Sequence, residues 1–415
     1  MRRSRHYSGV FLSVSAAVIL MMIFSFGCVK KEEAGEIKIG ALSAMTGDLA
    51  AYGGPILNGA KMAVDDINEA GGVLGKKLVL VSRDSQTDPT AAVDAANKLV
   101  NIDRVPAIVG ALSSGVTIPV ATSVSVPNEV VQISPASTSP EITTLKDNDF
   151  LFRTVPSDAL QCRVLAKVAM DRGFKRISTI YVNNAYGEGL AKAMKDAYEK
   201  IGGKVLVSVP FNKGETSYRS EVQKAVKDKP DALLLIAYPE NGVKILRQAI
   251  EFGLANKFLL PDGMKAPEVI RDVGAKYMNG TYGTAPAPAA SELTEKFKEK
   301  YKEKFGEYPP KPYIDTNYDA AILIALAMQK AGGSDGPSIR DALRDVANPP
   351  GEKVSMLDLK KALELLKEGK DIDYEGVSGS VNFDENGDVT GGSYGIWKIE
   401  DGKIVDEKVV FSDSL

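Results

Sequence analysis

The chain has 415 residues, of which 44% are hydrophobic and 25% are charged, and its formal net charge is −3. This length suggests two or three domains, and the composition is ordinary for a soluble globular protein, which excludes disordered, collagen-like and polytopic membrane proteins. Because there is no basic excess to neutralise phosphates, we expect no nucleic-acid partner.

Residues 1–27 have the pattern of a secretory signal peptide. Three arginines in the first five residues precede an uncharged apolar run over 10–26, and a glycine then stands before Cys28. This pattern predicts cleavage, lipidation of Cys28 and a polar tether over 28–35. The alternative is that the apolar run stays uncleaved as a membrane span. In both cases we expect the body of the protein outside the cytoplasm, attached to a membrane.

Strands and helices alternate from Glu36 onward, first in one series of βα units and then, from about residue 150, in a second. The first series has predicted strands at 36–42, 77–82, 107–111 and 130–134 and helices around 56–67, at 89–101 and from 113. The second has strands at 176–182, 204–209, 233–237 and 257–260 and helices at 187–201, 217–227 and 240–252. Such alternation predicts an α/β fold of two Rossmann-like lobes, each a parallel sheet with helices on both faces.

Two helices and three strands are predicted in the remainder of the chain. The helices fall at 293–305 and 313–332, and the strands at 379–383, 394–399 and 404–411. Strands that follow a block of helices fit a tail that returns to the second lobe. Between the first two of these strands, Asp384–Asp388 predicts a hairpin turn rather than a calcium loop, because its glycine stands in the wrong place for calcium binding.

Few residues are suited to catalysis or metal binding. Loss of the signal peptide removes His6, the only histidine, so the mature chain has neither Ser-His-Asp nor Cys-His catalysis, nor a His-containing zinc site. Ala111–Gly115 resembles a nucleophile elbow, but Ser113 then has no standard base. Cys162 reads as a buried apolar side chain in a helix. We therefore expect no catalytic residue, no metal and no cofactor.

Polar residues follow several predicted strands directly. Ser114 and Thr138 come after strands of the first series, and Asp262 after a strand of the second. In open α/β folds ligands bind beyond the carboxyl ends of the strands, where hydroxyls at helix starts favour an anion and Asp262 would hold a cation. This predicts a receptor for a zwitterion in a cleft between the lobes. The alternatives are that the hydroxyls cap helices and that Asp262 forms a turn.

At these positions the sequence resembles the substrate-binding proteins of branched-chain amino acid ABC importers, the Leu/Ile/Val-binding type. The matching stretches span almost the whole mature chain: Ile39–Gly47, Tyr52–Gly53, Asn58–Ala60, Asp66–Asn68 with Gly71–Gly72, Ser134–Pro135 with Thr138 and Pro140–Glu141, Tyr186–Leu190 and Tyr238–Glu240. The resemblance implies a type I periplasmic binding protein fold with a three-crossing hinge. It places 36–156 and 287–375 in lobe one, and 157–286 and 376–415 in lobe two.

The resemblance also implies roles for single residues. The Ser114 and Thr138 hydroxyls and the Ala136 backbone would bind the ligand carboxylate. Asp262, at a position where Leu/Ile/Val binders have Glu, would pair with the α-ammonium group. Three tyrosines would line the cleft around the aliphatic side chain: Tyr52, Tyr186 and Tyr238.

Together these features predict a monomeric, membrane-tethered receptor, and not an enzyme, that closes on a small amino acid and delivers it to the permease of an ABC importer. Three alternatives stay open. The first is a ligand-sensing subunit of a signalling system, and the second is a binder of an amide or another small polar solute, since relatives of this fold bind such molecules. The third is a hydrolase built on Ser113.

Overall fold

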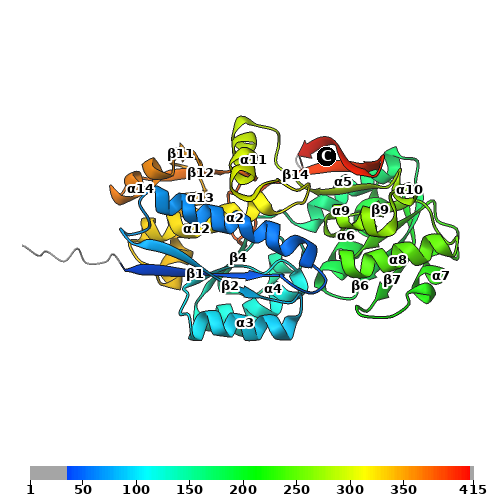
Figure 1. The fold of residues 1–415 in the computed structure, drawn as a ribbon, viewed down its shortest axis with the longest axis horizontal. Coiled ribbons are helices and arrows are strands. Elements are labelled where there is room, and N and C mark those ends of the chain that lie inside the picture. Colours follow the sequence, from blue (N-terminus) through cyan, green and yellow to red (C-terminus); the bar gives the residue numbers. More distant parts are fainter. Residues whose placement is uncertain (1–34, 412–415) are drawn as a thin grey trace, which may run out of the picture. The chain divides into compact units, whose positions relative to one another are not determined.

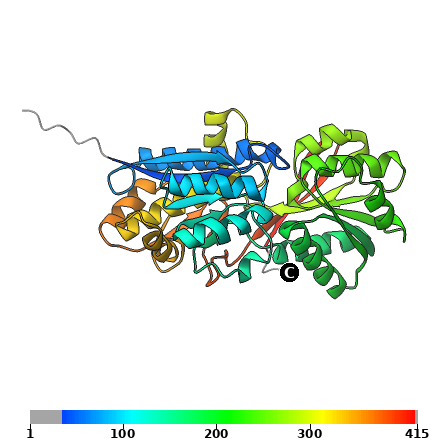
Figure 2. The same cartoon turned by 90° about the horizontal axis from the view of Figure 1, so that it is seen from below.

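Two β-sheets organise the chain into two lobes in a computed structural model that describes residues 35–411 (Figures 1 and 2). The first sheet has the order β2-β1-β3-β4-β5, and all its pairs are parallel. Its last strand corrects one expectation, because residues 151–153 pair with β4 instead of opening the second series. Its strands are β1 (Glu36–Ser43), β2 (Lys77–Asp84), β3 (Ala107–Gly110), β4 (Val131–Ser134) and β5 (Leu151–Arg153).

Helices cover both faces of the first sheet, as predicted. In Figure 1, α2, α12 and α13 lie above the sheet and α3 and α4 below it. Every residue of α12 from Ile314 to Met328 is buried, which accounts for the continuous apolar run over 320–328. The helix bounds are α2 (Ala50–Glu69), α3 (Pro89–Asn101), α4 (Ser114–Val120), α12 (Ile314–Ala331) and α13 (Gly336–Ala347). Short helical turns follow at η1 (Ala121–Ser125), η2 (Val126–Asn128) and η3 (Ile142–Thr144).

The second sheet has the order β15-β14-β10-β9-β8-β6-β7. The five strands from β6 to β10 run parallel to one another. In contrast, β14 is antiparallel to β10, and β15 is antiparallel to β14. A tight turn joins β14 to β15, and only antiparallel strands accept so short a link. The strands are β6 (Arg176–Val182), β7 (Lys204–Phe211), β8 (Ala232–Ile236), β9 (Phe258–Leu260), β10 (Tyr282–Pro286), β14 (Ser393–Glu400) and β15 (Lys403–Phe411).

Helices of the second lobe form two groups. One contains α5 and α6, which pack on each other, and the other contains α7, α8 and α9, which contact in sequence. The bounds are α5 (Asp158–Asp171), α6 (Ala185–Lys200), α7 (Arg219–Val226), α8 (Pro239–Glu251), η4 (Asp262–Met264), α9 (Pro267–Val273) and α10 (Ala275–Met278).

A small third sheet, with the order β11-β12-β13, lies against α12, α13 and α14 of the first lobe. The strand predicted at 379–383 is much shorter here, because only Gly379–Ser380 pairs with β12. The remaining elements are α11 (Glu292–Phe305), β11 (Glu352–Val354), α14 (Leu359–Lys367), β12 (Ile372–Gly376) and β13 (Gly379–Ser380).

Among the described residues the chain passes between the two large sheets after β5, after β10 and before β14. Asp384–Asp388 forms the predicted turn, in which the Asp384 carboxylate accepts hydrogen bonds from the backbone N–H groups of Asn386 and Asp388. Asp388 then forms an ion pair with buried Arg153 of β5. The turn therefore lies against the first lobe, and the exact lobe limits predicted above stay a prediction.

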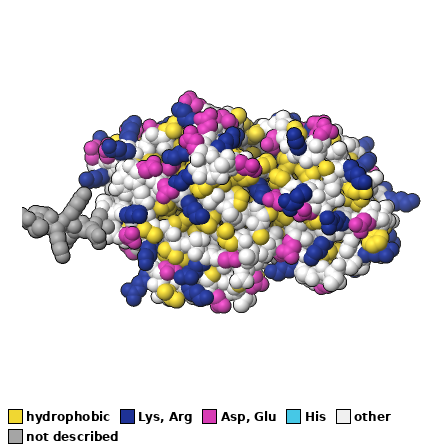
Figure 3. All heavy atoms as spheres, in the orientation of Figure 1, with side chains coloured by type: hydrophobic (Ala, Val, Ile, Leu, Met, Phe, Trp, Pro, Cys, Tyr) yellow, Lys and Arg dark blue, Asp and Glu magenta, His cyan; other side chains and the backbone are white. Residues whose placement is uncertain are grey.

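Residues 1–34 lie outside the described residues, so the signal peptide and the lipidation of Cys28 stay predictions. Within 35–411 no helix is both long enough and apolar enough to cross a membrane. On the face seen in Figure 3, basic and acidic side chains are interspersed rather than gathered by sign.

Candidate ligand-binding site

One cavity between the two lobes brings together most of the predicted ligand contacts. It is a small cavity of about 20 Å³, and its walls follow the carboxyl ends of strands in both sheets. Six of the seven predicted residues line it: Tyr52, Ser114, Ala136, Tyr186, Tyr238 and Asp262. The sequence did not single out the other five as ligand contacts: Leu49, Ile56, Leu112, Gly263 and Tyr313.

Glycines fix two of the lining tyrosines by letting helix starts approach strand ends. A Cβ on Gly53 would lie 2.0 Å from the Ala44 carbonyl oxygen, so only glycine lets the start of α2 pack there beside Tyr52. A Cβ on Gly187 would likewise lie 1.9 Å from the Val182 carbonyl oxygen at the end of β6. The Tyr-Gly pairs seen in the sequence are therefore the means by which both tyrosines reach the cavity.

The Asp262 carboxylate points at polar side chains around the cavity. It accepts hydrogen bonds from the hydroxyls of Tyr313 (2.6 Å) and Tyr186 (3.0 Å) and from the amide nitrogen of Gln161 (2.9 Å). Only 3% of the residue is exposed, and burial raises its pKa, although these three hydrogen bonds lower it in part. Asp262 therefore has the surroundings of a buried site carboxylate, beyond what a turn residue requires.

Asp158, the first residue of α5, is a second buried carboxylate beside Asp262. The residue is fully buried, and neither carboxylate oxygen has a hydrogen-bond partner of normal geometry in the described part of the chain. Burial raises its pKa well above the usual aspartate range, and repulsion by Asp262 raises it further. The nearby Thr138 hydroxyl and Arg153 guanidinium lower the pKa in part. A carboxylate held in this way is suited to a cation, because buried charges are otherwise paired.

The hydroxyls that the sequence predicts for an anion lie in the first lobe. Ser114 Oγ accepts a hydrogen bond from the Ser139 N–H (3.1 Å), which leaves the hydroxyl proton of Ser114 available to a ligand. Thr138 is fully buried and does not line the cavity, and its hydroxyl has no partner of normal geometry among residues 35–411. Neither Ser113 nor Ser114 caps α4 through its side chain. The capping alternative for Ser114 is therefore wrong.

Direct contacts join the two lobes around the cavity. Tyr52 donates a hydrogen bond to the Gly263 carbonyl oxygen (3.1 Å), and Ser113 Oγ lies 2.8 Å from the Tyr238 hydroxyl oxygen. Tyr238 also stacks on Tyr186, with ring centroids 5.3 Å apart. Burial raises the pKa of all three tyrosines, so they stay neutral donors. The lobes are thus in contact across the cavity, and Ser113 is paired with a tyrosine rather than with a base.

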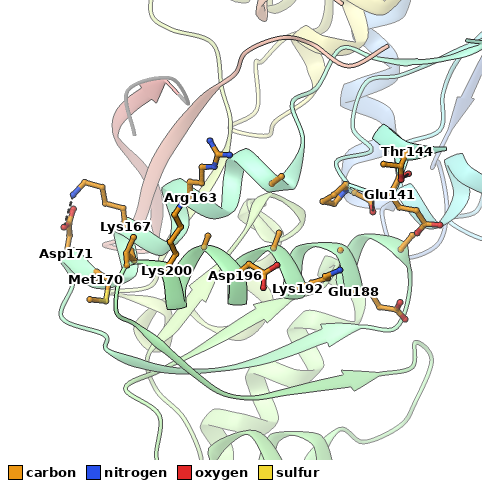
Figure 4. A pocket seen from close by; sticks show the side chains of 18 residues that line it. Glu141, Thr144, Arg163, Lys167, Met170, Asp171, Glu188, Lys192, Asp196 and Lys200 are labelled. Atoms are coloured by element: carbon orange, nitrogen blue, oxygen red, sulfur yellow. Dashed lines mark hydrogen bonds and ion pairs between the residues drawn. The ribbon is translucent and has the colours of Figure 1, made fainter. Parts of the chain in front are cut away.

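Two other hollows are lined by none of the seven predicted ligand-binding residues. The first is an open groove between α5 and α6, where Arg163, Lys167 and Lys192 stand on the same surface as Asp171 and Asp196 (Figure 4). The second lies beside the passages between the lobes, and Asp315 and Phe411 are among its lining residues. Within the described ranges, no group of three or more His, Cys, Asp or Glu side chains is placed to hold a metal ion.

Asp158, Gln161 and Tyr313 are the polar residues of this site that sequence reasoning missed. An acidic residue in the first turn of a helix is normally explained by the helix dipole, so Asp158 gave no separate signal. Tyr313 precedes a helix of the first lobe, far along the chain from the Asp262 that it contacts. The signal that could have found Asp158 and Gln161 is their spacing of three on one helix face, directly after the first passage between the lobes.

Comparisons with known proteins agree with this architecture. A family model described as periplasmic binding protein matches residues 36–353. A leucine-, isoleucine-, valine-, threonine- and alanine-binding protein of Pseudomonas aeruginosa is 32% identical over 358 residues, covering 86% of this chain and 88% of that protein. A substrate-binding protein of a chemotactic signal transduction system of Halobacterium salinarum is 28% identical over 359 residues, covering 84% of this chain and 83% of that protein.

Solved structures give the same result for the fold. A branched-chain amino acid transporter substrate-binding protein of Streptococcus pneumoniae, in complex with isoleucine, superposes with a TM-score of 0.75 at 25% identity. The match covers 91% of this chain and 99% of that one. The two-lobed α/β fold, the family model and the coverage of the relatives lead to one conclusion: the chain belongs to the periplasmic binding protein family.

Proposed function

We propose that the protein is an extracytoplasmic receptor that captures a small amino acid of the branched-chain type between its lobes and delivers it to the permease of an ABC importer. The observation that carries this proposal is a buried carboxylate of the second lobe, Asp262, and a hydroxyl of the first lobe, Ser114, on the wall of one cavity, with the buried carboxylate of Asp158 acting on Asp262. A zwitterion supplies the cation that the carboxylates lack and the anion to which the Ser114 hydroxyl donates a hydrogen bond.

The remaining walls of the cavity indicate an apolar side chain on the ligand. Leu49, Ile56 and Leu112 add only hydrocarbon to the lining, and the rings of Tyr52 and Tyr238 add mostly aromatic surface. A compact aliphatic amino acid fits these walls better than a charged or a large aromatic one. The names of the Pseudomonas and Streptococcus relatives agree with this choice.

The proposed location rests on the N-terminal sequence. Cleavage before Cys28 and lipidation of its thiol would attach the protein to the outer surface of the cytoplasmic membrane through the tether over 28–35. A lipid-anchored monomer near the membrane would meet the importer by diffusion in two dimensions. A second candidate function is ligand sensing for a signalling system, and the relative in Halobacterium salinarum is the observation that favours it.

A thermal-shift screen tests the function directly. We expect L-leucine, L-isoleucine or L-valine to raise the melting temperature of the purified protein, because a ligand at 100 times its dissociation constant stabilises the folded state by about 2.7 kcal/mol. Short-chain amides, which carry no charge, and L-glutamate, which carries a second carboxylate, serve as controls. Stabilisation by amides alone would replace the amino-acid proposal with the amide alternative, and a flat response to every amino acid would reject it.

A further inference from the structure

The surroundings of Asp158 and Asp262 contain no free cation among the described residues. The groups that face the pair from the packed elements are neutral: Thr138, Gln161, Cys162, Tyr186, Tyr313 and Tyr394. Arg153 is the one guanidinium that acts on Asp158. It is already committed to Asp388 (2.5 and 2.6 Å), to the Ser139 carbonyl oxygen (2.9 Å) and to Thr143 Oγ1 (2.8 Å).

Two other buried cations, the lysines Lys265 and Lys311, are also paired with carboxylates. Lys311 donates to Glu268 at 2.6 Å, and Lys265 donates to Asp406 at 2.8 Å. Two carboxylates that share a buried space without a counter-ion do not both ionise, because repulsion and lost hydration together favour one bound proton. The three hydrogen bonds to Asp262 favour its charged form, so the proton resides on Asp158.

We infer that the empty cavity carries one proton on the Asp158–Asp262 pair and that the ammonium group of the ligand displaces this proton when it binds. The inference rests on the proposed function and adds a regulation to it. The step is balanced without covalent chemistry. The ligand keeps its three ammonium protons, the pair loses one proton to solvent, and the charge of the site changes from −1 to −2 against a bound +1.

The sign of the pH dependence follows from this exchange. Burial raises the pKa of both aspartates, and Asp262 raises the pKa of Asp158 further. Below the raised pKa of the pair, binding must expel a proton, so affinity falls by up to about tenfold for each unit of pH lost. Above that pKa both carboxylates are already ionised, and the dependence ends. The receptor therefore binds more tightly as the pH rises and releases its ligand more readily in an acidic medium.

The same raised pKa predicts an opposite effect on the empty protein. A carboxyl whose pKa is higher in the folded state stabilises the fold at low pH, and this contribution is lost as pH rises through the folded-state pKa. The empty protein loses this contribution at higher pH, whereas ligand binding becomes stronger. The gain in melting temperature on adding ligand should therefore grow as the pH rises toward the raised pKa of the pair.

Calorimetric titration with L-leucine in two buffers of different ionisation heat counts the protons released. For the wild-type protein we expect about one proton per bound ligand at the acidic end and a count near zero at the alkaline end. Asp158→Asn should bring the count near zero at every pH. Asp315→Asn is the matched control, since burial raises the pKa of Asp315 to about 6 at the hollow beside the lobe passages.

Three results decide the matter. A wild-type count near zero at every pH overturns the exchange, whatever the variants do. If the Asp158→Asn variant still releases a proton on binding but the Asp315→Asn variant does not, the exchange is also overturned, because the released proton then comes from Asp315. Loss of the count in Asp158→Asn, with Asp315→Asn unchanged, supports it.

A measurement on the empty protein separates this inference from the proposed function. Infrared spectra recorded below the raised pKa of the pair should contain a protonated-carboxyl band that is absent from Asp158→Asn and shifted in frequency in Asp262→Asn, because the neighbouring charge is gone. If neither difference spectrum contains such a band, the shared proton does not exist. If no amino acid binds while the band is present, the proposed function fails and the shared proton stands. Two variants are used so that the test remains possible if one of them does not fold. A variant counts only if it melts cooperatively.

Discussion

Asp262→Asn is expected to weaken binding of L-leucine by about 30-fold to several-thousand-fold. Asp262 is the carboxylate that lines the cavity, and truncating one partner of a buried charge pair costs about 2–5 kcal/mol, at 1.4 kcal/mol for each factor of ten. Calorimetric titration of the variant measures the loss. The empty variant should keep its free energy of unfolding within about 1 kcal/mol, because the amide oxygen still accepts hydrogen bonds and the tyrosine hydroxyls can rotate.

Asp315→Asn is a suitable control for this variant. Asp315 is also buried, but it does not line the cavity, and its carboxylate accepts a hydrogen bond from the neighbouring Thr316 N–H (2.9 Å) that an amide oxygen would keep. We expect its affinity for L-leucine within threefold of wild type. If Asp262→Asn binds as tightly as this control, Asp262 does not hold the ammonium group, and Asp158 must do so alone or the site lies elsewhere.

Arg153→Met is expected to lower the free energy of unfolding by about 3–5 kcal/mol, the typical loss when one partner of a buried ion pair is removed. Arg153 is completely buried and holds Asp388 in a bidentate pair, together with the Ser139 carbonyl oxygen and Thr143 Oγ1. Its loss frees the loop that precedes η3 and leaves the Asp388 charge without its cation. Denaturant titration of the empty protein measures the change.

The double variant Arg153→Met/Asp388→Leu tests the cause of that loss. Replacing both charges by apolar groups removes the unpaired carboxylate, so we expect recovery of a substantial part of the lost stability. A single variant that loses less than about 1 kcal/mol would show that water replaces the guanidinium and that the pair contributes little.

Much of the fold is predictable because its elements have strong local signals. The helix at 89–101 and the strand at 176–182 are observed with the predicted bounds. The first has Asp88 as a side-chain cap and Pro89 at its first turn, and the second is an almost continuous buried strand. Strand pairing over long distances has no such local signal, which is why the small sheet of β11, β12 and β13 escaped prediction and why the alternation of elements alone put β5 at the start of the second series.

The candidate site divides in the same way. Ser114, Ala136 and Asp262 follow strands directly, so the rule for open α/β sheets brings them to one edge and the structure places them on one cavity. Asp158 reaches the site through the packing of α5 within the second lobe, and Tyr313 through the packing of one lobe against the other. The sequence contains no periodicity or spacing that reports such packing, and their roles became visible only through burial and hydrogen bonding.

The central claim is that a zwitterion is held between two buried carboxylates and the hydroxyls of the opposite lobe. Calorimetric titration with L-leucine, 4-methylpentanoate and 3-methylbutylamine tests it most directly, because the second molecule lacks the ammonium group and the third lacks the carboxylate. The account predicts tight binding of L-leucine and binding at least about 100-fold weaker for both analogues, from the loss of about 2–5 kcal/mol for each unmatched charge. Binding of 4-methylpentanoate as tight as that of L-leucine would contradict it.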